Sequence, residues 1–120
     1  MTTAVYNIPR QLEGVGPLRA GLYTNAFGED EAVQKQLSPI THVGRDKGIP
    51  PFLILHVADR PDATAQSKAF AKALEAAGVR AKLVPGEDKT HGTINRELGL
   101  PDDEPTKALF EFLDEVLAKQ

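Results

Sequence analysis

The sequence contains no cysteine, and it has no apolar run long enough for a membrane-spanning helix. The absence of cysteine excludes disulfides, thiolate metal sites and a thiol nucleophile, but it does not identify the compartment. A transmembrane helix needs about 20 consecutive apolar residues, and no signal-peptide pattern is recognisable. We therefore expect no membrane span and take the cytoplasm as the default location.

A strong excess of one charge is also missing. The formal net charge is −3, and the two signs are mixed along the chain without a basic stripe, so we expect no nucleic-acid partner. Three histidines, without cysteine and without partners at helical metal-binding spacing, predict no metal site, and we expect no cofactor. With 120 residues, the chain is predicted to form one domain, residues 1–120, with a real hydrophobic core.

The most informative stretch is Pro50–Asp59, which reads PPFLILHVAD. Its continuous apolar run, bounded by two prolines and a polar turn, is typical of a parallel strand covered on both faces. A buried helix of similar composition is the competing interpretation, but the two prolines and the break at Arg60-Pro61-Asp62 argue against it. Asp59 then follows the carboxyl end of a central strand, the edge on which open α/β sheets place their ligands.

The residues after Asp59 predict a helix and a second strand. Apolar side chains recur at helical spacing from about Ala63 to Ala77, and Gly78 suits the end of that helix. Val79–Val84 then alternates apolar and charged residues, as an edge strand does. Strand, helix and strand in this order predict an α/β fold with parallel crossovers.

Weaker patterns complete the expected fold. Thr2–Ile8 has strand character, whereas Pro9–Gly28, with four glycines and two prolines, is predicted to be irregular with at most a short helical turn. Glu29–Gln36 is expected to be a short helix, Pro85–Pro101 a long loop, and a final helix opens at Asp102. We expect a small three-layer α/β domain, with a mainly parallel sheet of three strands and flanking helices.

Two residues point to a catalytic site. Asp59 ends the central strand and His91 follows the next strand, so adjacent parallel strands place both on the same carboxyl rim of the sheet. A carboxylate that fixes the tautomer of a histidine supplies two-thirds of a Ser-His-acid triad, and Asp62 is the reserve acid. Taken singly, Asp59 also suits a turn acid and His91 a surface loop residue. His56 is interpreted as a core histidine bonded to a neighbour, and His42 as a loop residue.

An ordered set of short motifs surrounds these two residues. They are Tyr6-Asn7-Ile8-Pro9, Phe27-Gly28, Ser38–Val43, Pro50–Asp59, Ala65-Gln66-Ser67, His91-Gly92-Thr93-Ile94 and Phe110–Leu113. With this set, almost the whole chain from Tyr6 onward resembles the C-terminal half of α/β-hydrolases, in the esterase, lipase and arylformamidase-like branch. The resemblance implies that Asp59 is the triad acid and His91 the triad histidine. Their order agrees with the Ser…Asp…His order of this fold.

The chain departs from that family in its nucleophile. It contains no G-x-S-x-G elbow, since Ser38 precedes a proline and Ser67 falls inside the predicted helix after Asp59. The HGG-type segment that supplies oxyanion-hole amides is missing as well. We therefore expect a fragment or one product of a split gene, in which an N-terminal hydrolase half would carry the serine and the oxyanion hole. Without that half, the chain should show no meaningful ester hydrolysis.

Two alternatives stay open. In one, the chain is a non-catalytic α/β domain that acts by association, because the exposed edge of the first predicted strand favours a homodimer or another partner. In the other, it is a small stand-alone enzyme that uses Asp59 and His91 for general acid–base chemistry. A small ester is the expected substrate only for the complete hydrolase.

Overall fold

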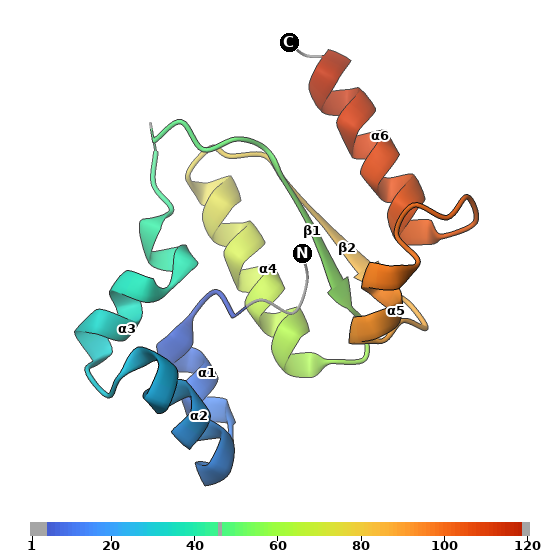
Figure 1. Ribbon diagram of the computed structural model, residues 1–120. Coiled ribbons are helices and arrows are strands. Elements are labelled where there is room, and N and C mark those ends of the chain that lie inside the picture. The colour runs from blue at the N-terminus through green and yellow to red at the C-terminus, as the bar shows by residue number, and fades with distance from the viewer. Residues whose placement is uncertain (1–4, 46, 119–120) are drawn as a thin grey trace.

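The computed structural model describes residues 5–45 and 47–118, and these form an α/β structure with two strands and six α-helices. The chain is flat, with extents of 44 × 36 × 18 Å (Figure 1). None of the helices in the described part is long and apolar enough to cross a membrane. In order, the elements are α1 (Ile8–Gly14), α2 (Pro17–Phe27), α3 (Glu31–Leu37), the 3₁₀ turn η1 (Pro39–His42), β1 (Phe52–Val57), α4 (Pro61–Ala76), β2 (Ala81–Gly86), α5 (His91–Arg96) and α6 (Glu104–Ala118).

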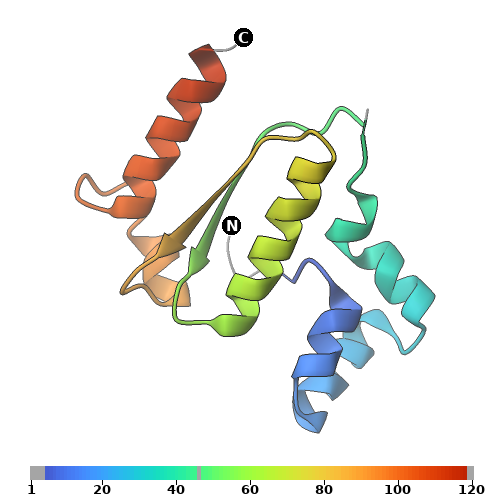
Figure 2. The same ribbon diagram turned by 180° about the vertical axis from the view of Figure 1, so that it is seen from behind.

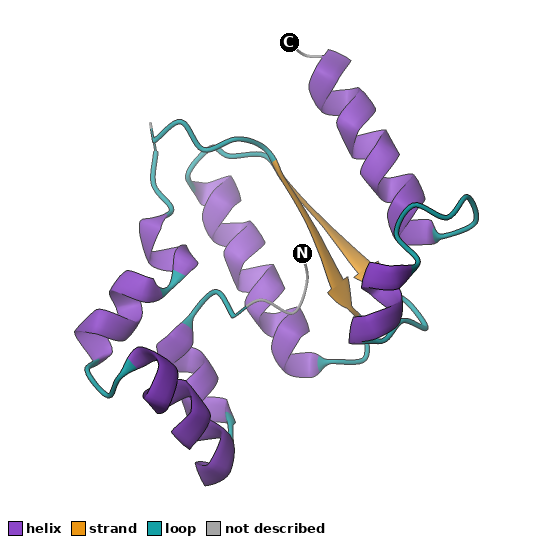
Figure 3. Cartoon of the chain, viewed as in Figure 1, coloured by secondary structure: helices purple, strands orange, loops and turns teal. Residues whose placement is uncertain are grey.

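The two strands pair in parallel, as predicted for Pro50–Asp59 and for the strand that follows the helix. The register runs from Phe52 opposite Ala81 to Val57 opposite Gly86. Helix α4 connects them, so strand, helix and strand form one crossover unit. Figure 3 shows this short sheet between α4 on one side and α5 and α6 on the other.

Alternate side chains of β1 supply the two cores of the molecule. On the α4 face, Ile54 packs with Phe70 and Leu74, and the ring of Tyr6 stacks on Phe70 with 4.3 Å between centroids. On the opposite face, a second cluster forms around Ile94 of α5, with Leu55 and Val57 from the strand. Burial on both faces explains why the apolar run of β1 is continuous rather than alternating.

The helix predicted from about Ala63 to Ala77 is confirmed as α4, which begins two residues earlier, at Pro61, and ends at Ala76. Pro61 opens its first turn, where a missing backbone N–H costs nothing. At its other end Gly78 adopts a φ of +79°, and the Val79 amide reaches back to the Leu74 carbonyl at 2.8 Å. This left-handed turn favours glycine because a side chain there is strained.

The prediction of an irregular Pro9–Gly28 is wrong, because α1 and α2 occupy this segment. Both prolines lie in the first turn of a helix, where they favour helical backbone instead of breaking it. The Asn7 side chain caps α1 by accepting from the Arg10 amide at 3.1 Å, and Gly28 ends α2 with a φ of +78°. Apart from Gly21, which lies inside α2, the glycines and prolines here therefore mark helix ends.

The third strand predicted over Thr2–Ile8 does not appear among the described residues. Positions 2–4 lie outside them, and Ile8 already begins α1. The amides of Tyr6 and Asn7 donate to the side-chain oxygen of Gln66, at 3.2 and 2.9 Å, instead of to a neighbouring strand. This stretch is therefore tied to α4 and not to the sheet.

The long loop predicted over Pro85–Pro101 contains α5. Thr90 caps this helix through a reciprocal bond with Thr93, in which each side chain accepts from the other residue's amide, at 3.1 and 2.8 Å. The sequence signal was weaker than usual because threonine replaces the glutamate of a typical capping box. The predicted short helix near Glu29–Gln36 is confirmed as α3, capped by Asp30.

The final helix is confirmed as α6, but much of its apolar stripe is exposed. Phe112 is buried, whereas Leu113 and Leu117 are 40% and 61% exposed. The helix is held to the sheet by ion pairs from Arg80 and Lys82 to its acidic residues. It therefore meets β2 through a charged margin, and part of its stripe is exposed. Figure 2 shows that the C-terminal end of α6 extends away from the two strands.

Candidate functional site

The first component of the site is the turn between β1 and α4. Just after β1, the Ala58 amide donates a hydrogen bond to the Gly86 carbonyl of β2 at 3.3 Å. The turn itself is closed by a hydrogen bond from the Arg60 amide to the Val57 carbonyl, also at 3.3 Å. Asp59 lies in this turn, two residues beyond the end of β1, and its side chain is exposed. Asp62, the reserve acid, is also exposed and occupies the first turn of α4, where the helix dipole favours a negative charge.

The second component is the first turn of α5. His91 is the first residue of that helix, five residues beyond the end of β2, and it is exposed. Because β1 and β2 are parallel neighbours, Asp59 and His91 both follow carboxyl ends at the same rim of the sheet. Adjacency of the two strand ends is therefore confirmed, while direct pairing of the two side chains stays a prediction.

Helix α5 is fixed against the strand ends by close packing. A Cβ added to Gly86 would lie 2.8 Å from Cδ1 of Ile94 and 3.2 Å from the backbone oxygen of His56. Ile94 has no exposed surface at all. A side chain at position 86 would force Ile94 or its neighbours to shift, so Gly86 permits the close approach of α5, the helix that begins at His91.

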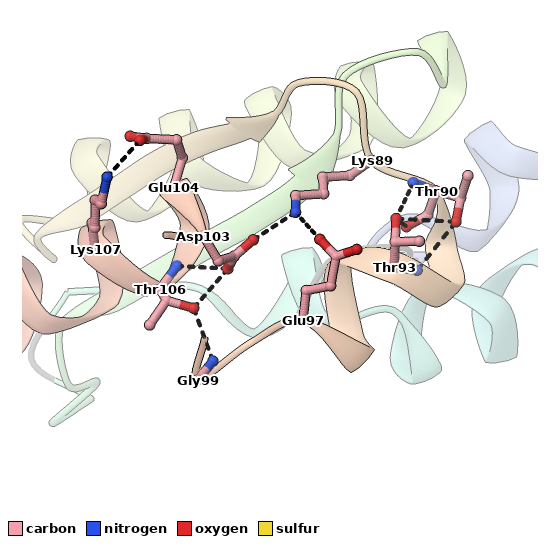
Figure 4. A network of polar contacts seen from close by, with 9 residues as sticks. All are labelled: Lys89, Thr90, Thr93, Glu97, Gly99, Asp103, Glu104, Thr106 and Lys107. Carbon is pink, nitrogen blue, oxygen red and sulfur yellow. Dashed lines mark hydrogen bonds and ion pairs between the residues drawn. The ribbon is translucent and has the colours of Figure 1, made fainter. Parts of the chain in front are cut away.

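A buried charge network holds the loop before His91 (Figure 4). Lys89 pairs with Asp103 at 2.6 Å and also with Glu97. Asp103 in turn caps α6, accepting from the backbone and hydroxyl of Thr106 at 3.0 and 2.6 Å. The Thr106 hydroxyl accepts from the Gly99 amide at 2.8 Å, which closes the network. It joins α5, the following turn and the start of α6.

The network shifts the ionisation of its members. Burial alone raises the pKa of Asp103, but hydrogen bonds from Lys89 and Thr106 outweigh this and hold the pKa below its ordinary value. The pKa of Lys89 is raised by its bonds to Asp103 and Glu97. Both shifts favour the charged forms, so the loop that precedes His91 is anchored by the ion pair of Lys89 and Asp103.

A cleft of about 840 Å³ opens on the other side of Asp59. It lies between the α1–α2 connection and the start of α4, elements that lie close together in both views (Figures 1 and 2). We call it the arginine cleft, because three of its lining residues are arginines. Its charged lining residues are Arg10, Arg19, Arg60, Asp59 and Asp62, and His91 does not line it.

A set of amide bonds forms one wall of the arginine cleft. Gln66, which is buried, accepts from two backbone amides and donates to the Asn7 carbonyl at 3.0 Å and to Gln11 at 3.3 Å. Gln11 then donates to the Tyr23 hydroxyl at 3.4 Å. These bonds connect α4, α1 and α2, so the three elements around the cleft are held together by satisfied polar groups.

The other two histidines, His56 and His42, have different partners and do not line the arginine cleft. His56 is buried in β1, and its Nδ1 lies 3.2 Å from the Thr64 hydroxyl, which confirms a core histidine bonded to a neighbour. Burial lowers its pKa, and the positive charge of Lys68 adds to the effect. His42 ends η1 and contacts the Gln36 carbonyl. Among the described residues, no three His, Asp or Glu side chains come together as metal ligands.

No family model, curated protein or solved structure matches the chain.

Two parts of the site were missed by the sequence analysis. The arginine cleft was invisible because Arg10 and Arg19 fell in a segment predicted to be irregular, although Pro9 and Pro17 could have signalled helix starts. The network around Asp103 was missed because its partner Lys89 is 14 residues away. Only the Asp103–Thr106 cap spacing was readable locally.

Proposed function

We propose that this chain is the C-terminal portion of a serine carboxylic-ester hydrolase, which supplies the acid and the histidine of a catalytic triad. The observation that carries the proposal is the parallel pairing of β1 with β2, which brings the turn of Asp59 and the helix start of His91 to one rim. The rigid support of His91 by Gly86 and by the Lys89–Asp103 pair also favours it. A general base needs such fixed placement to act within hydrogen-bond reach of its proton.

In this proposal each residue has one role. The Asp59 carboxylate accepts from one ring nitrogen of His91 and so fixes the tautomer. The other ring nitrogen takes the proton of an attacking serine hydroxyl and returns it to the leaving alcohol. The serine and the oxyanion-hole donors come from a second polypeptide segment, because neither Ser38 nor Ser67 is accessible. Both are buried, and the Ser38 hydroxyl is engaged with the Ile8 amide and the Gln34 carbonyl.

The test is an assay of the chain with p-nitrophenyl acetate, alone and mixed with the polypeptide encoded immediately upstream of it. We expect no turnover above the buffer rate from the chain alone, and turnover from the mixture. In the mixture, Asp59→Asn should lower kcat about 10⁴-fold, as loss of a triad acid does. The control Asp114→Asn, at an exposed residue of α6 that does not line the arginine cleft, should leave kcat unchanged.

Three results would contradict the proposal. Turnover by the isolated chain would mean that the nucleophile has been misplaced. Upstream DNA without an encoded G-x-S-x-G motif would remove the source of the serine. A mixture that stays fully active after His91→Ala would remove the base.

A second candidate function is association without catalysis, and the exposed apolar residues of α6 favour it. Phe110 is 58% exposed on the helix that also exposes Leu113 and Leu117. Light scattering of the purified chain separates the two proposals. A tight dimer that dissociates in a Leu113→Glu, Leu117→Glu variant supports association, whereas a stable monomer with an inducible esterase activity supports the hydrolase.

A further inference from the structure

We infer that the arginine cleft binds an anionic group, so that the ester acted on by the assembled enzyme carries a carboxylate. Only the statement that the ligand is an ester rests on the proposed function. Binding of the anionic group rests on the cleft itself. The cleft shares Asp59 with the rim described above, so a molecule held in it lies next to the proposed acid.

The charges of the cleft carry the inference. Arg10 comes from α1, Arg19 from α2 and Arg60 from the turn before α4. Within the described residues, none of these three guanidinium groups takes part in an ion pair or lies over an aromatic ring. By contrast, Lys35, Arg80, Lys82, Lys89 and Lys107 all have a carboxylate partner. Other described cations without a carboxylate partner, such as Arg45, Lys68 and Arg96, lie elsewhere, but Arg10, Arg19 and Arg60 line this one concave surface.

Guanidinium groups recognise carboxylates in a forked, bidentate geometry, which gives orientation as well as attraction. Three groups from three separate elements surround a ligand from several directions, whereas three arginines on one exposed helix face would not. The two acids of the cleft, Asp59 and Asp62, leave it a formal charge of +1, and Asp62 accepts hydrogen bonds from donors on the same ligand. A small molecule with one carboxylate and a neighbouring hydroxyl or amine fits this distribution.

The cleft is also preorganised. Its position between α1, α2 and α4 is set by the buried amide bonds of Gln66, all of which are satisfied internally. Binding therefore does not need to order these elements first, which keeps the entropic cost of association low.

The experiment compares two probes that differ in one charge. Monomethyl succinate carries an ester and a carboxylate, while dimethyl succinate carries two esters and no charge. Each is titrated into the isolated full chain, and the backbone amide resonances of Gly14, Gly16 and Gln66 are followed by NMR. We expect saturable shifts with monomethyl succinate and none with dimethyl succinate over the same range.

Variants then locate the charge. The double substitution Arg10→Gln, Arg19→Gln should raise the dissociation constant for monomethyl succinate about tenfold or more, since a hydrogen bond to a charged group contributes at least that much. Arg96→Gln removes the same type of charge from the exposed end of α5, outside the cleft, and should leave the dissociation constant unchanged. Circular dichroism of each variant checks that the helices are retained.

Failure of this inference is distinguishable from failure of the proposed function, because no turnover is required. Equal binding of both probes, no binding of monomethyl succinate, or undiminished binding by the double variant would each overturn it. If binding behaves as expected but the mixed esterase assay fails, the anion site stands and the triad proposal falls. If the mixture is active on p-nitrophenyl acetate but the cleft binds nothing, the reverse holds.

Discussion

The β1–α4–β2 unit and the N-terminal helices α1 and α2 are held together in different ways. In the first, Ile54, Phe70 and Leu74 bury apolar surface between strand and helix. In the second, α2 buries no residue, and its Leu18 and Leu22 are 87% and 68% exposed. What connects α1 and α2 to the rest includes the amides of Gln66 and Gln11. One region is stabilised mainly by the hydrophobic effect, whereas the other buries one large apolar side chain, Ile8 of α1, and otherwise depends on a few buried hydrogen bonds.

The largest effect should come from the apolar region. Leu74→Ala removes a side chain that is 1% exposed and leaves a cavity against β1, so we expect a loss of about 2–5 kcal/mol of unfolding free energy. Urea denaturation followed by circular dichroism measures this loss. The matched control is Leu22→Ala on α2, which should change stability by less than about 0.5 kcal/mol. Equal losses in the two variants would mean that the two regions do not differ as described.

The next largest effect should come from removing the hydrogen bonds of Gln66, which hold the N-terminal helices. Gln66→Leu keeps the volume but leaves the Tyr6 and Asn7 amides without their acceptor, which should cost about 1–3 kcal/mol. Hydrogen exchange should accelerate in α1 more than in β1. Gln36→Leu, at an exposed position in α3, is the control and should leave exchange in α1 unchanged. Uniform acceleration along the chain would indicate one cooperative unit instead of two.

A smaller effect tests the polar network within the α/β region. Asp103→Asn retains a cap for α6 but removes the ion pair with Lys89, and we expect a smaller loss of unfolding free energy than in Gln66→Leu because solvent at Lys89 screens the pair. Because the folded-state pKa of Asp103 is lowered, its contribution is present above the unfolded pKa and is lost as the pH falls through the folded pKa. The difference between wild type and variant should therefore shrink below about pH 4. A constant difference down to pH 2 would contradict this account.

The smallest effect concerns His56. Burial lowers its pKa in the folded state, so the fold favours the neutral ring. This contribution is complete above the unfolded pKa of about 6.5 and is lost as the pH falls below it, because the unfolded chain then binds a proton more readily. Unfolding free energies at pH 7.5 and 5.5 should differ more for the wild type than for His56→Gln. An equal pH dependence in the wild type and in His56→Gln would contradict this account.

The same contrast explains how much could be predicted from the sequence. The strand at Pro50–Asp59 and the helix after it were predictable because their apolar pattern is set by burial on their own faces. α1 and α2 were not, because α2 has no buried stripe and its ends are marked only by Pro17 and Gly28. Hydrogen bonds between residues about 60 positions apart, such as those of Gln66, leave no local pattern at all.

The candidate site also has features that were predictable from the sequence and features that were not. The common rim of Asp59 and His91 followed from strand order alone, since parallel neighbours must share their carboxyl ends. The tight contact at Gly86 and the pairing of Lys89 with Asp103 depend on how α5 and α6 return to the sheet. The positions of α5 and α6 against the sheet depend on long-range packing, which leaves no local pattern in a single sequence.

The dependence of the first described residues on Gln66 has a consequence for synthesis on the ribosome. The acceptor for the Tyr6 and Asn7 amides is translated 60 and 59 residues after them. At a translation rate of about 5–20 residues per second, several seconds pass after the synthesis of α1 and α2 before Gln66, which accepts these hydrogen bonds, is synthesised. Nascent-chain protection in this segment should therefore appear late, after the middle of the polypeptide has emerged.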